Sequence, residues 1–444
     1  MISIPGTVLK TSSRFSLRKA SVAACLLVPS FGFAATFGPV TLTSVAALDK
    51  QARQEVSAKS RAPLADAASS VFMGIDSLEK EGSGRVPNYV RAMGAMPKLA
   101  GPFSHLFKTF ISSSSLPSET KLAMALRISQ INNSPYTAAH VERLLKATER
   151  GKAVLKAMES GQTASLTNPE KQAVAYADSL TRHVDGLTDA EFQSARAFYN
   201  DSQVVELTYT VCFFNYFTRF AEALNLPAEA WVFDTAPAAL KAAPPAPARV
   251  ALVSDEEMKA METAVAASKA NNSPSAGWNI GIANSQRAMM HAPAMFQAWR
   301  EFGAAANEYS MVSREIKLQV SFAVSTANGC RYCTLHQVLG LRRQGVDAAK
   351  LMSMQKDDSS LKTDELAAVT FARKLTAEPS GTTDKDFANL REVFKDQGAI
   401  EVLMQTCNFA FMNRFTDGLR LPSEDEALKV YQETYGEGWH RKAK

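Results

Sequence analysis

The sequence is poor in cysteine, and its five cysteines in 444 residues are too few and too scattered for a disulfide framework. It also has little excess charge, because 49 Lys and Arg residues against 44 Asp and Glu residues leave a net charge of +5. The basic residues are dispersed and form no stripe that would follow a phosphate backbone, so no nucleic-acid partner is expected. Cys330 and Cys333 are only three positions apart, which makes them a redox pair or half of a metal site.

Runs of alternating β-branched residues bounded by hairpin turns are also lacking. Apolar residues make up 46% of the chain and charged residues 21%, which is typical of a folded globular protein. From 315 to 327, apolar residues recur too densely for a surface helix, which indicates a helix buried on most sides. Turn formers such as Asn328-Gly329 and Gly345 separate the helical segments. The predicted fold class is all-α.

Residues 1–47 have the features of a targeting segment. Basic residues precede an apolar, Ala-rich stretch at 20–35, and small residues follow at 44–47. Pro29 and Gly32 interrupt the stretch, which disfavours a membrane-spanning helix. The pattern predicts export to the periplasm, and the alternatives are an uncleaved anchor or a cytoplasmic protein with a disordered extension.

An internal repeat organises the rest of the chain. The segment VCFFNYFTRFAEALNLP at 211–227 matches TCNFAFMNRFTDGLRLP at 406–422, with an offset of 195 positions. An offset of 196 relates a second set of residues, in which Glu119, Ser134, Tyr136, Thr137 and His140 correspond to Glu315, Cys330, Tyr332, Cys333 and His336. A slip of one position is what a diverged tandem duplication leaves.

The repeat also predicts the domain boundaries. A Pro- and Ala-rich linker at 236–251 contains prolines that do not fit a helix interior. It separates a first copy at 48–235, which lacks the cysteine pair, from a second copy at 252–444, which carries it. We expect the two copies to form a pseudo-dimer.

The second copy contains the candidate site. Asn328-Gly329 is expected to end one helix, so that Cys330 lies in the first turn of the next, where the helix dipole stabilises a thiolate. At 100° per residue, Cys330, Cys333, His336 and Gln337 share one face. His336 is placed to take the proton of Cys333, and Glu315 on the preceding helix is placed to orient that base.

The run NGCRYCTLHQ, with an acidic residue one helix earlier and NFAFMNRFTDGL about eighty residues later, resembles the alkylhydroperoxidase (AhpD-like) and carboxymuconolactone decarboxylase superfamily. The resemblance implies an all-helical fold, often duplicated, in a homo-oligomer such as a trimer of two-domain chains. It implies a thiol-dependent peroxidase in which Cys333 is oxidised by a hydroperoxide and Cys330 resolves the sulfenic acid into a disulfide. His336 and Glu315 would be the proton relay, and an external dithiol or thioredoxin-like protein the reductant, with no other cofactor and no metal.

Two departures from the family pattern affect the relay. The family's histidine usually stands four residues after the second cysteine, where this chain has Gln337, and its glutamate usually stands about one turn nearer the cysteines than Glu315. His140 and Glu119 keep the same shifted spacing in the first copy, so we interpret the shifts as a subfamily variant.

Ser134 and Thr137 occupy the thiol positions of the first copy, and neither supports a disulfide cycle. That copy is expected to be redox-silent, with a hydrolytic or decarboxylating role as the alternative. For the second copy, a zinc site is an alternative that lacks a nearby fourth ligand. The remaining alternatives are a general disulfide oxidoreductase, a carboxymuconolactone-decarboxylase-like non-redox lyase, and a non-catalytic assembly protein.

Overall fold

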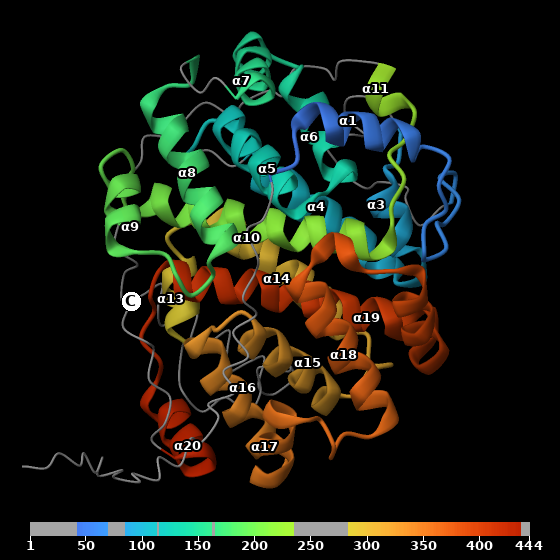
Figure 1. Cartoon of the computed structure of the whole chain (residues 1–444), viewed down its shortest axis with the longest axis vertical. Coiled ribbons are helices and arrows are strands. Elements are labelled where there is room, and N and C mark those ends of the chain that lie inside the picture. The colour runs from blue at the N-terminus through green and yellow to red at the C-terminus, as the bar shows by residue number, and fades with distance from the viewer. Residues whose placement is uncertain (1–41, 70–84, 113–114, 162–164, 235–282, 437–444) are drawn as a thin grey trace, which may run out of the picture. The chain divides into compact units, whose positions relative to one another are not determined.

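Helices form all the regular secondary structure of the part of the chain that the computed structural model describes, residues 42–69, 85–112, 115–161, 165–234 and 283–436 (Figure 1). No strand occurs among these residues. The all-α prediction is therefore confirmed. No helix in these ranges has both the length and the apolar character needed to cross a membrane.

The first half of the chain contains α1 (Val45–Gln54), α3 (Asn88–Arg91), η2 (Ala92–Ala95), η3 (Pro97–Leu99), α4 (Ala100–Ser112), α5 (Ser118–Asn132), α6 (Pro135–Leu145), α7 (Glu149–Ser160), α8 (Asn168–Arg182), α9 (Asp189–Arg196), α10 (Asp201–Leu224) and α11 (Trp231–Asp234). The second half contains α13 (Asn284–Met289), α14 (Pro293–Asn307), α15 (Arg314–Ala327), α16 (Arg331–Arg343), α17 (Ala348–Lys356), α18 (Thr363–Ala377), η5 (Pro379–Gly381), α19 (Asp384–Gly418) and α20 (Asp425–Tyr435). Lys395, with φ 59° and ψ −174°, divides α19 into two helices that meet at this residue.

Local sequence signals set the helix ends. The Thr167 hydroxyl accepts the N–H of Glu170, whose carboxylate accepts the N–H of Thr167 in return, and this capping box starts α8. Asn200 and Gln203 start α10 in the same way. Asn225 ends α10 in the left-handed conformation, with φ 47°. Short polar residues therefore define where the buried helices begin and end.

The long helices α10 and α19 run side by side and hold the two halves together (Figure 1). Each sends one buried arginine to a carbonyl of the other half. Nη2 of Arg219 donates to Thr376 O at 3.5 Å, and Nη2 of Arg414 donates to Thr181 O at 3.1 Å. Burial lowers the pKa of Arg219 to about 10 and lowers the pKa of Arg414 as well. These two matching bonds tie α10 to the second half and α19 to the first.

The described residues all belong to one compact unit, and its largest apolar cluster contains residues from both halves. The halves therefore share a core. The linker expected at 236–251 lies outside the described residues, as does the leader from 1 to 41. Val45 of α1 is buried and Ser44 caps that helix, so the expected leader boundary at residue 47 falls inside a packed element. Duplication as the origin of the two halves stays a prediction.

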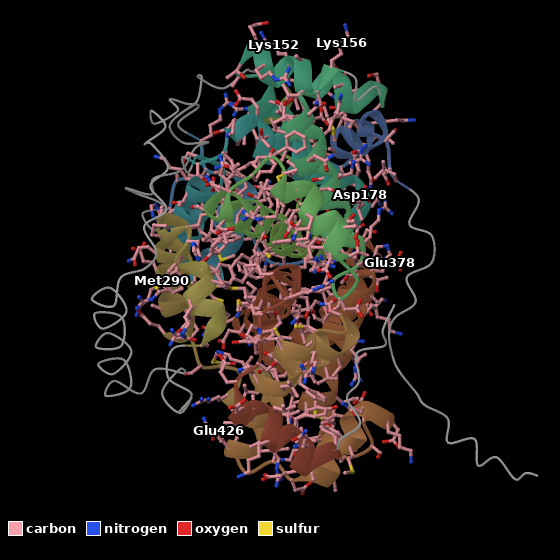
Figure 2. The ribbon with its side chains drawn as sticks, turned by 90° about the vertical axis from the view of Figure 1, so that its left-hand side faces the viewer. Lys152, Lys156, Asp178, Met290, Glu378 and Glu426 are labelled. Atoms are coloured by element: carbon pink, nitrogen blue, oxygen red, sulfur yellow. The ribbon has the colours of Figure 1, made fainter. Side chains whose placement is uncertain are left out.

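Charged side chains cover the outer faces of the peripheral helices. Figure 2 shows Lys152 and Lys156 on α7 pointing away from the core, and Glu426 on α20 doing the same. The opposite face of α7 buries Val154 and Leu155. A peripheral helix such as α7 therefore has one apolar face that packs inward and one charged face that is exposed to solvent. This pattern does not explain the polar residues that are buried in the core.

Candidate functional site

The turn between α15 and α16 places the two cysteines. Asn328 caps the end of α15, and Gly329 has a φ of +71°, which reverses the chain. Cys330 then caps the start of α16, and its Sγ accepts the N–H of Cys333 at 3.3 Å. The predicted helix end and the predicted position of Cys330 at a helix start are both confirmed.

Both thiols converge on one hydroxyl of α19. Sγ of Cys330 and Sγ of Cys333 each lie 3.3 Å from Oγ1 of Thr416. The Thr416 hydroxyl donates its own hydrogen to Met412 O at 3.0 Å. Its two lone pairs are therefore available to accept both S–H groups, and this arrangement fits two neutral, reduced thiols side by side.

Burial controls the ionisation of Cys330. Cys330 is fully buried and Cys333 is 3% exposed. Desolvation raises the pKa of the Cys330 thiol well above its usual value, and the Cys333 thiol and the Asp417 carboxylate raise it further. The helix start was expected to favour a thiolate, but at Cys330 the desolvation cost exceeds the dipole effect because no solvent reaches the sulfur.

A histidine–carboxylate pair lies on the next turn of α16. Nδ1 of His336 lies 2.7 Å from Tyr332 O, and because a carbonyl only accepts, Nδ1 carries a hydrogen. Nε2 of His336 lies 2.6 Å from Oε2 of Glu424. When the imidazole is protonated, this contact is an ion pair. Tyr332 Oη donates to Oε1 of Glu424 at 3.1 Å and fixes the carboxyl group.

Glu315, which was expected to orient His336, makes its contacts with other residues. Its carboxylate accepts from Gln319 at 3.1 Å and pairs with Lys350 at 2.8 Å. Glu315 is in the first turn of α15, and about 18 Å of helix separates it from Ala327, at a rise of about 1.5 Å per residue. The carboxylate in contact with His336 is Glu424, which corrects the expectation that Glu315 orients this base.

The first half repeats the histidine–carboxylate pair without the thiols. Nε2 of His140 lies 2.9 Å from Oε2 of Glu229, and Tyr136 Oη donates to the same carboxylate at 3.2 Å. Glu229 and Glu424 each stand two residues after the proline that ends the matched segments. The Tyr–His–Glu cluster therefore occurs in both halves, at equivalent positions.

The thiol positions of the first half form a hydroxyl–carboxyl cluster instead. Oγ of Ser134 lies 2.9 Å from Oγ1 of Thr137 and donates to Oε1 of Glu222 at 2.7 Å. Burial raises the pKa of Glu222 to about 8, against the lowering effect of the Ser134 hydrogen bond. This cluster has proton donors and acceptors but no redox centre.

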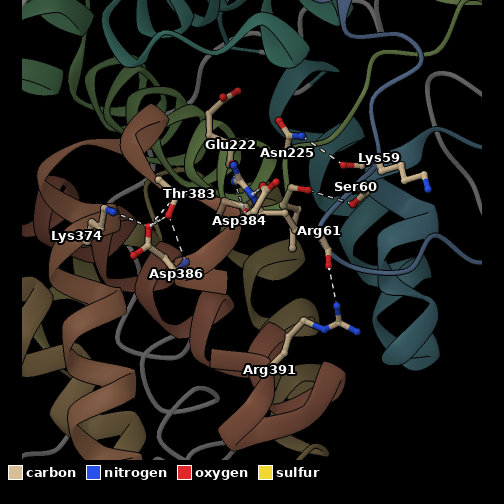
Figure 3. Close-up of polar contacts among 12 residues, drawn as sticks. Lys59, Ser60, Arg61, Glu222, Asn225, Lys374, Thr383, Asp384, Asp386 and Arg391 are labelled. Atoms are coloured by element: carbon tan, nitrogen blue, oxygen red, sulfur yellow. Dashed lines mark hydrogen bonds and ion pairs between the residues drawn. The ribbon is translucent and has the colours of Figure 1, made fainter. Parts of the chain in front are cut away.

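Figure 3 shows how the chain covers the end of α10 beside Glu222. Nη1 of Arg61 donates to Glu222 O at 2.7 Å and to Ala223 O at 3.1 Å, while its Nε binds Asp384 at 2.6 Å. A cation at the last carbonyls of a helix stabilises its negative end. Ser60 Oγ adds a bond to Leu224 O at 3.1 Å. Residues 60 and 61 thus cap the C-terminal end of α10, and the positions 196 residues later lie outside the described part of the chain.

Sequence reasoning missed Thr416 and Glu424. Comparison of the two matched segments would have pointed to Thr416, because Ala221 occupies its place in the half without thiols. Glu424 had a weaker signal, since it follows the matched segment and stands 88 positions after His336. Cys212 and Cys407 are fully buried, with pKa values that burial raises, and a buried free cysteine of this kind packs as a small apolar side chain. Among the described residues, no group of three or more His, Cys, Asp or Glu side chains is placed to hold a metal ion.

Residues 293–373, from the start of α14 into α18, match the model of the carboxymuconolactone decarboxylase family. Two solved structures are similar. The apo debrominase Bmp8 is 22% identical, with 35% of this chain and 84% of that chain covered and a TM-score of 0.32. A cysteine-to-alanine variant of Bmp8 in complex with 2,3,4-tribromopyrrole is 21% identical, with 34% and 83% covered and a TM-score of 0.32. No curated protein matches the chain.

Proposed function

We propose that the second half of this chain, in which residues 293–373 match the carboxymuconolactone decarboxylase family, is a thiol-dependent peroxidase that cycles Cys330 and Cys333 between dithiol and disulfide. One observation supports this function above the others: both reduced sulfurs meet at the Thr416 hydroxyl, in the first turn of one helix. Two thiols that contact the same hydroxyl, three residues apart at a helix start, are candidates for a disulfide.

The more accessible sulfur is the better candidate for attack on the peroxide. Cys333 is 3% exposed and Cys330 is fully buried, with a pKa that burial raises. Cys333 therefore attacks the hydroperoxide, whose O–O bond breaks, and it becomes a sulfenic acid while an alcohol leaves. The Cys330 thiol then displaces water from that sulfenic acid, and the disulfide forms. An external dithiol reduces the disulfide by thiol–disulfide exchange.

The His336–Glu424 pair supplies the proton that this reaction needs. The leaving alkoxide takes a proton from the pair, and the proton of the Cys333 thiol replaces it, so that no net charge accumulates in the buried site. His336 keeps the relay role expected from the sequence, and Glu424 takes the role expected for Glu315. Tyr332 holds the Glu424 carboxyl in place.

The burial of the sulfurs favours small substrates. A folded partner protein with a disulfide of its own cannot approach two side chains that are 0% and 3% exposed without displacing α19 or its covering residues. A hydroperoxide needs far less room. We therefore favour peroxide reduction over a general disulfide oxidoreductase function.

A carboxymuconolactone-decarboxylase-like lyase is the second candidate, and one observation favours it. The Tyr–His–Glu cluster occurs in both halves, including the half in which Ser134 and Thr137 replace the thiols. Proton transfer at this cluster does not require sulfur. Such a lyase would keep its activity when both Cys330 and Cys333 are replaced by serine, whereas the peroxidase would lose it.

Intact-mass analysis after one equivalent of hydroperoxide tests the peroxidase. We expect the wild-type chain to lose two hydrogens and Cys330→Ser to gain one oxygen, located at Cys333 by peptide mapping. Cys407→Ser is the matched control, because it removes a buried thiol away from the pair and should react like the wild type. An unchanged mass in the wild type, or rapid peroxide consumption by Cys333→Ser, would contradict the proposal.

A further inference from the structure

A pocket lies in the same half of the chain, away from the thiols. Side chains of α14, α15 and α19 surround a space of about 620 Å³, including the part open to solvent, and Met96 of the first half closes one side. Trp299, Phe302 and Met404 provide apolar walls. The polar lining residues are Asn307, Lys317, Glu401, Gln405 and Asn408.

The pocket exists because three large side chains of the first half have small or polar counterparts here. In the first half, Phe110 packs on Phe213 with ring centroids 4.7 Å apart, and Phe107 packs on Phe213 at 5.8 Å. The residues at the corresponding positions line the pocket, with Gly303 in place of Phe107, Ala306 in place of Phe110, and Asn408 in place of Phe213. A Cβ added at Gly303 would meet nothing within 4 Å. A glycine inside a helix costs about 1 kcal/mol relative to alanine, yet here no neighbour requires it.

The same replacements uncover a lysine. Lys121 of the first half is fully buried and pairs with Glu206 at 2.9 Å. At the corresponding positions, Lys317 pairs with Glu401 at 2.9 Å, but the Lys317 side chain is 22% exposed and lines the pocket. Lys317 Nζ also donates to Tyr309 O at 3.0 Å. An ammonium has three hydrogens, so one remains for a ligand.

Glu401 also lines the pocket, and its carboxylate is shared between Lys317 and two backbone N–H groups. Its Oε1 accepts the N–H of Met311 at 3.1 Å, and its Oε2 accepts the N–H of Val312 at 3.2 Å. Two backbone donors and the ammonium thus share this carboxylate, which leaves the third N–H of Lys317 able to bind an anion. The apolar wall is rigid, since Trp299 stacks on Phe411 with centroids 3.9 Å apart and planes 11° apart.

We propose that this pocket binds a small organic anion with a flat apolar body and one carboxylate. The apolar body packs between Trp299, Phe302 and Met404, and the carboxylate accepts from Lys317 and the side-chain amides beside it. The site is distinct from the thiol site, because Asn408 and Thr416 are eight residues apart on α19, about 12 Å along the helix. It does not depend on the proposed peroxidase activity.

Calorimetric titration of the full chain with benzoate, and with benzamide as the uncharged analogue, tests this proposal. We expect benzoate to bind with a dissociation constant of about 1 mM or below and benzamide to bind at least about tenfold more weakly. Gly303→Leu adds an apolar side chain to the pocket wall, at a position where a Cβ has open space, and should weaken benzoate binding by about tenfold or more. Gly101→Leu is the matched control, because Gly101 is also a helical glycine with nothing within 4 Å and does not line the pocket.

Helical circular dichroism establishes that both leucine variants fold. Three results would each overturn the proposal: no heat of binding with benzoate at about 10 mM, equal binding of benzamide and benzoate, or a Gly303→Leu variant that binds benzoate like the wild type. Equal loss of binding in Gly101→Leu would also reject it, since the effect would then not come from the pocket.

Discussion

Nε2 of His336 and Oε2 of Glu424 lie 2.6 Å apart, at a point where Nδ1 of the same imidazole already donates to a carbonyl. The contact is repeated between His140 and Glu229 at 2.9 Å. Since the second half has the thiols and the first does not, the two pairs allow the same substitution to be tested with and without sulfur chemistry beside it.

Glu424→Gln should slow disulfide formation. Glutamine still accepts from Tyr332 but cannot hold or release a proton, so the histidine loses its exchange partner. We expect the rate of peroxide-dependent loss of two hydrogens to fall by about a hundredfold, as for loss of one acid–base group. Quenched-flow sampling followed by mass analysis measures this rate.

Glu229→Gln is the control for that substitution. It makes the same change in the first half, where no thiol is adjacent, and should leave the rate within about twofold of the wild type, well below the effect of losing an acid–base group. An equal loss of rate in both variants would mean that the pairs only stabilise the fold, and the relay role of Glu424 would be rejected.

The part of the site that could be predicted from the sequence is the part that local geometry determines. Asn328-Gly329 ends a helix wherever it follows one, and the spacing of Cys330 and Cys333 then places both in one turn. Thr416 was missed because it lies 86 positions from Cys330, and only the packing of α19 against α16 brings it there. Periodicity within one helix contains no information about such a contact.

The two expectations that differed from the structure failed for different reasons. Glu315 was assigned by its spacing in the sequence, but a straight helix of this length moves its first turn away from the cysteines. The expected thiolate followed from the helix dipole, an effect of about 1 kcal/mol, whereas complete burial of an ionised sulfur costs more. Burial cannot be read from a C-x-x-C motif, because it depends on what packs above it.

Thr416→Val should disturb the thiol pair without removing its sulfurs. Valine has nearly the shape of threonine but accepts no hydrogen bond, so two buried S–H groups lose their acceptor, at a cost of about 1 kcal/mol each. We expect a lower unfolding temperature for the reduced form and a smaller change for the disulfide form, which has no S–H to satisfy. Thr416→Ser keeps the hydroxyl and should resemble the wild type in both states. Equal destabilisation of both redox forms by Thr416→Val would indicate a packing effect instead.

Glu222 gives the first half a pH-dependent stability. Burial raises the pKa of its carboxyl to about 8, above the value of about 4.5 for an exposed side chain, so the folded state binds more protons between these values. The contribution of the protonated Glu222 carboxyl to the free energy of unfolding is fully present below about pH 4.5 and is lost as the pH rises through about 8. Glu222→Gln should therefore flatten the fall in unfolding temperature across this range and stabilise the chain at pH 8, by roughly 2 °C for each kcal/mol.

Glu142 provides the internal comparison for that measurement. Burial raises the pKa of Glu142 to about 7, so this group adds a second fall in stability that should persist in Glu222→Gln. Differential scanning fluorimetry from pH 5 to 9 on the wild type, Glu222→Gln and Glu142→Gln separates the contributions of the two carboxyl groups. A pH profile that Glu222→Gln leaves unchanged would show that the carboxyl ionises in the folded chain at no cost.

Gly329→Ala tests whether the turn before Cys330 positions the thiols. Gly329 has φ +71°, and an added Cβ would lie 2.9 Å from Oδ2 of Asp185 in the first half, so alanine is both strained and crowded. Gly161→Ala is the matched control, because Gly161 has φ +66° and nothing within 4 Å. Each variant should lose about 1–2 kcal/mol from the left-handed backbone. Only Gly329→Ala should also slow peroxide-dependent disulfide formation, because displacement of the turn moves Cys330 as well. Equal rates of disulfide formation in the two variants would show that the thiols keep their geometry without this contact between the halves.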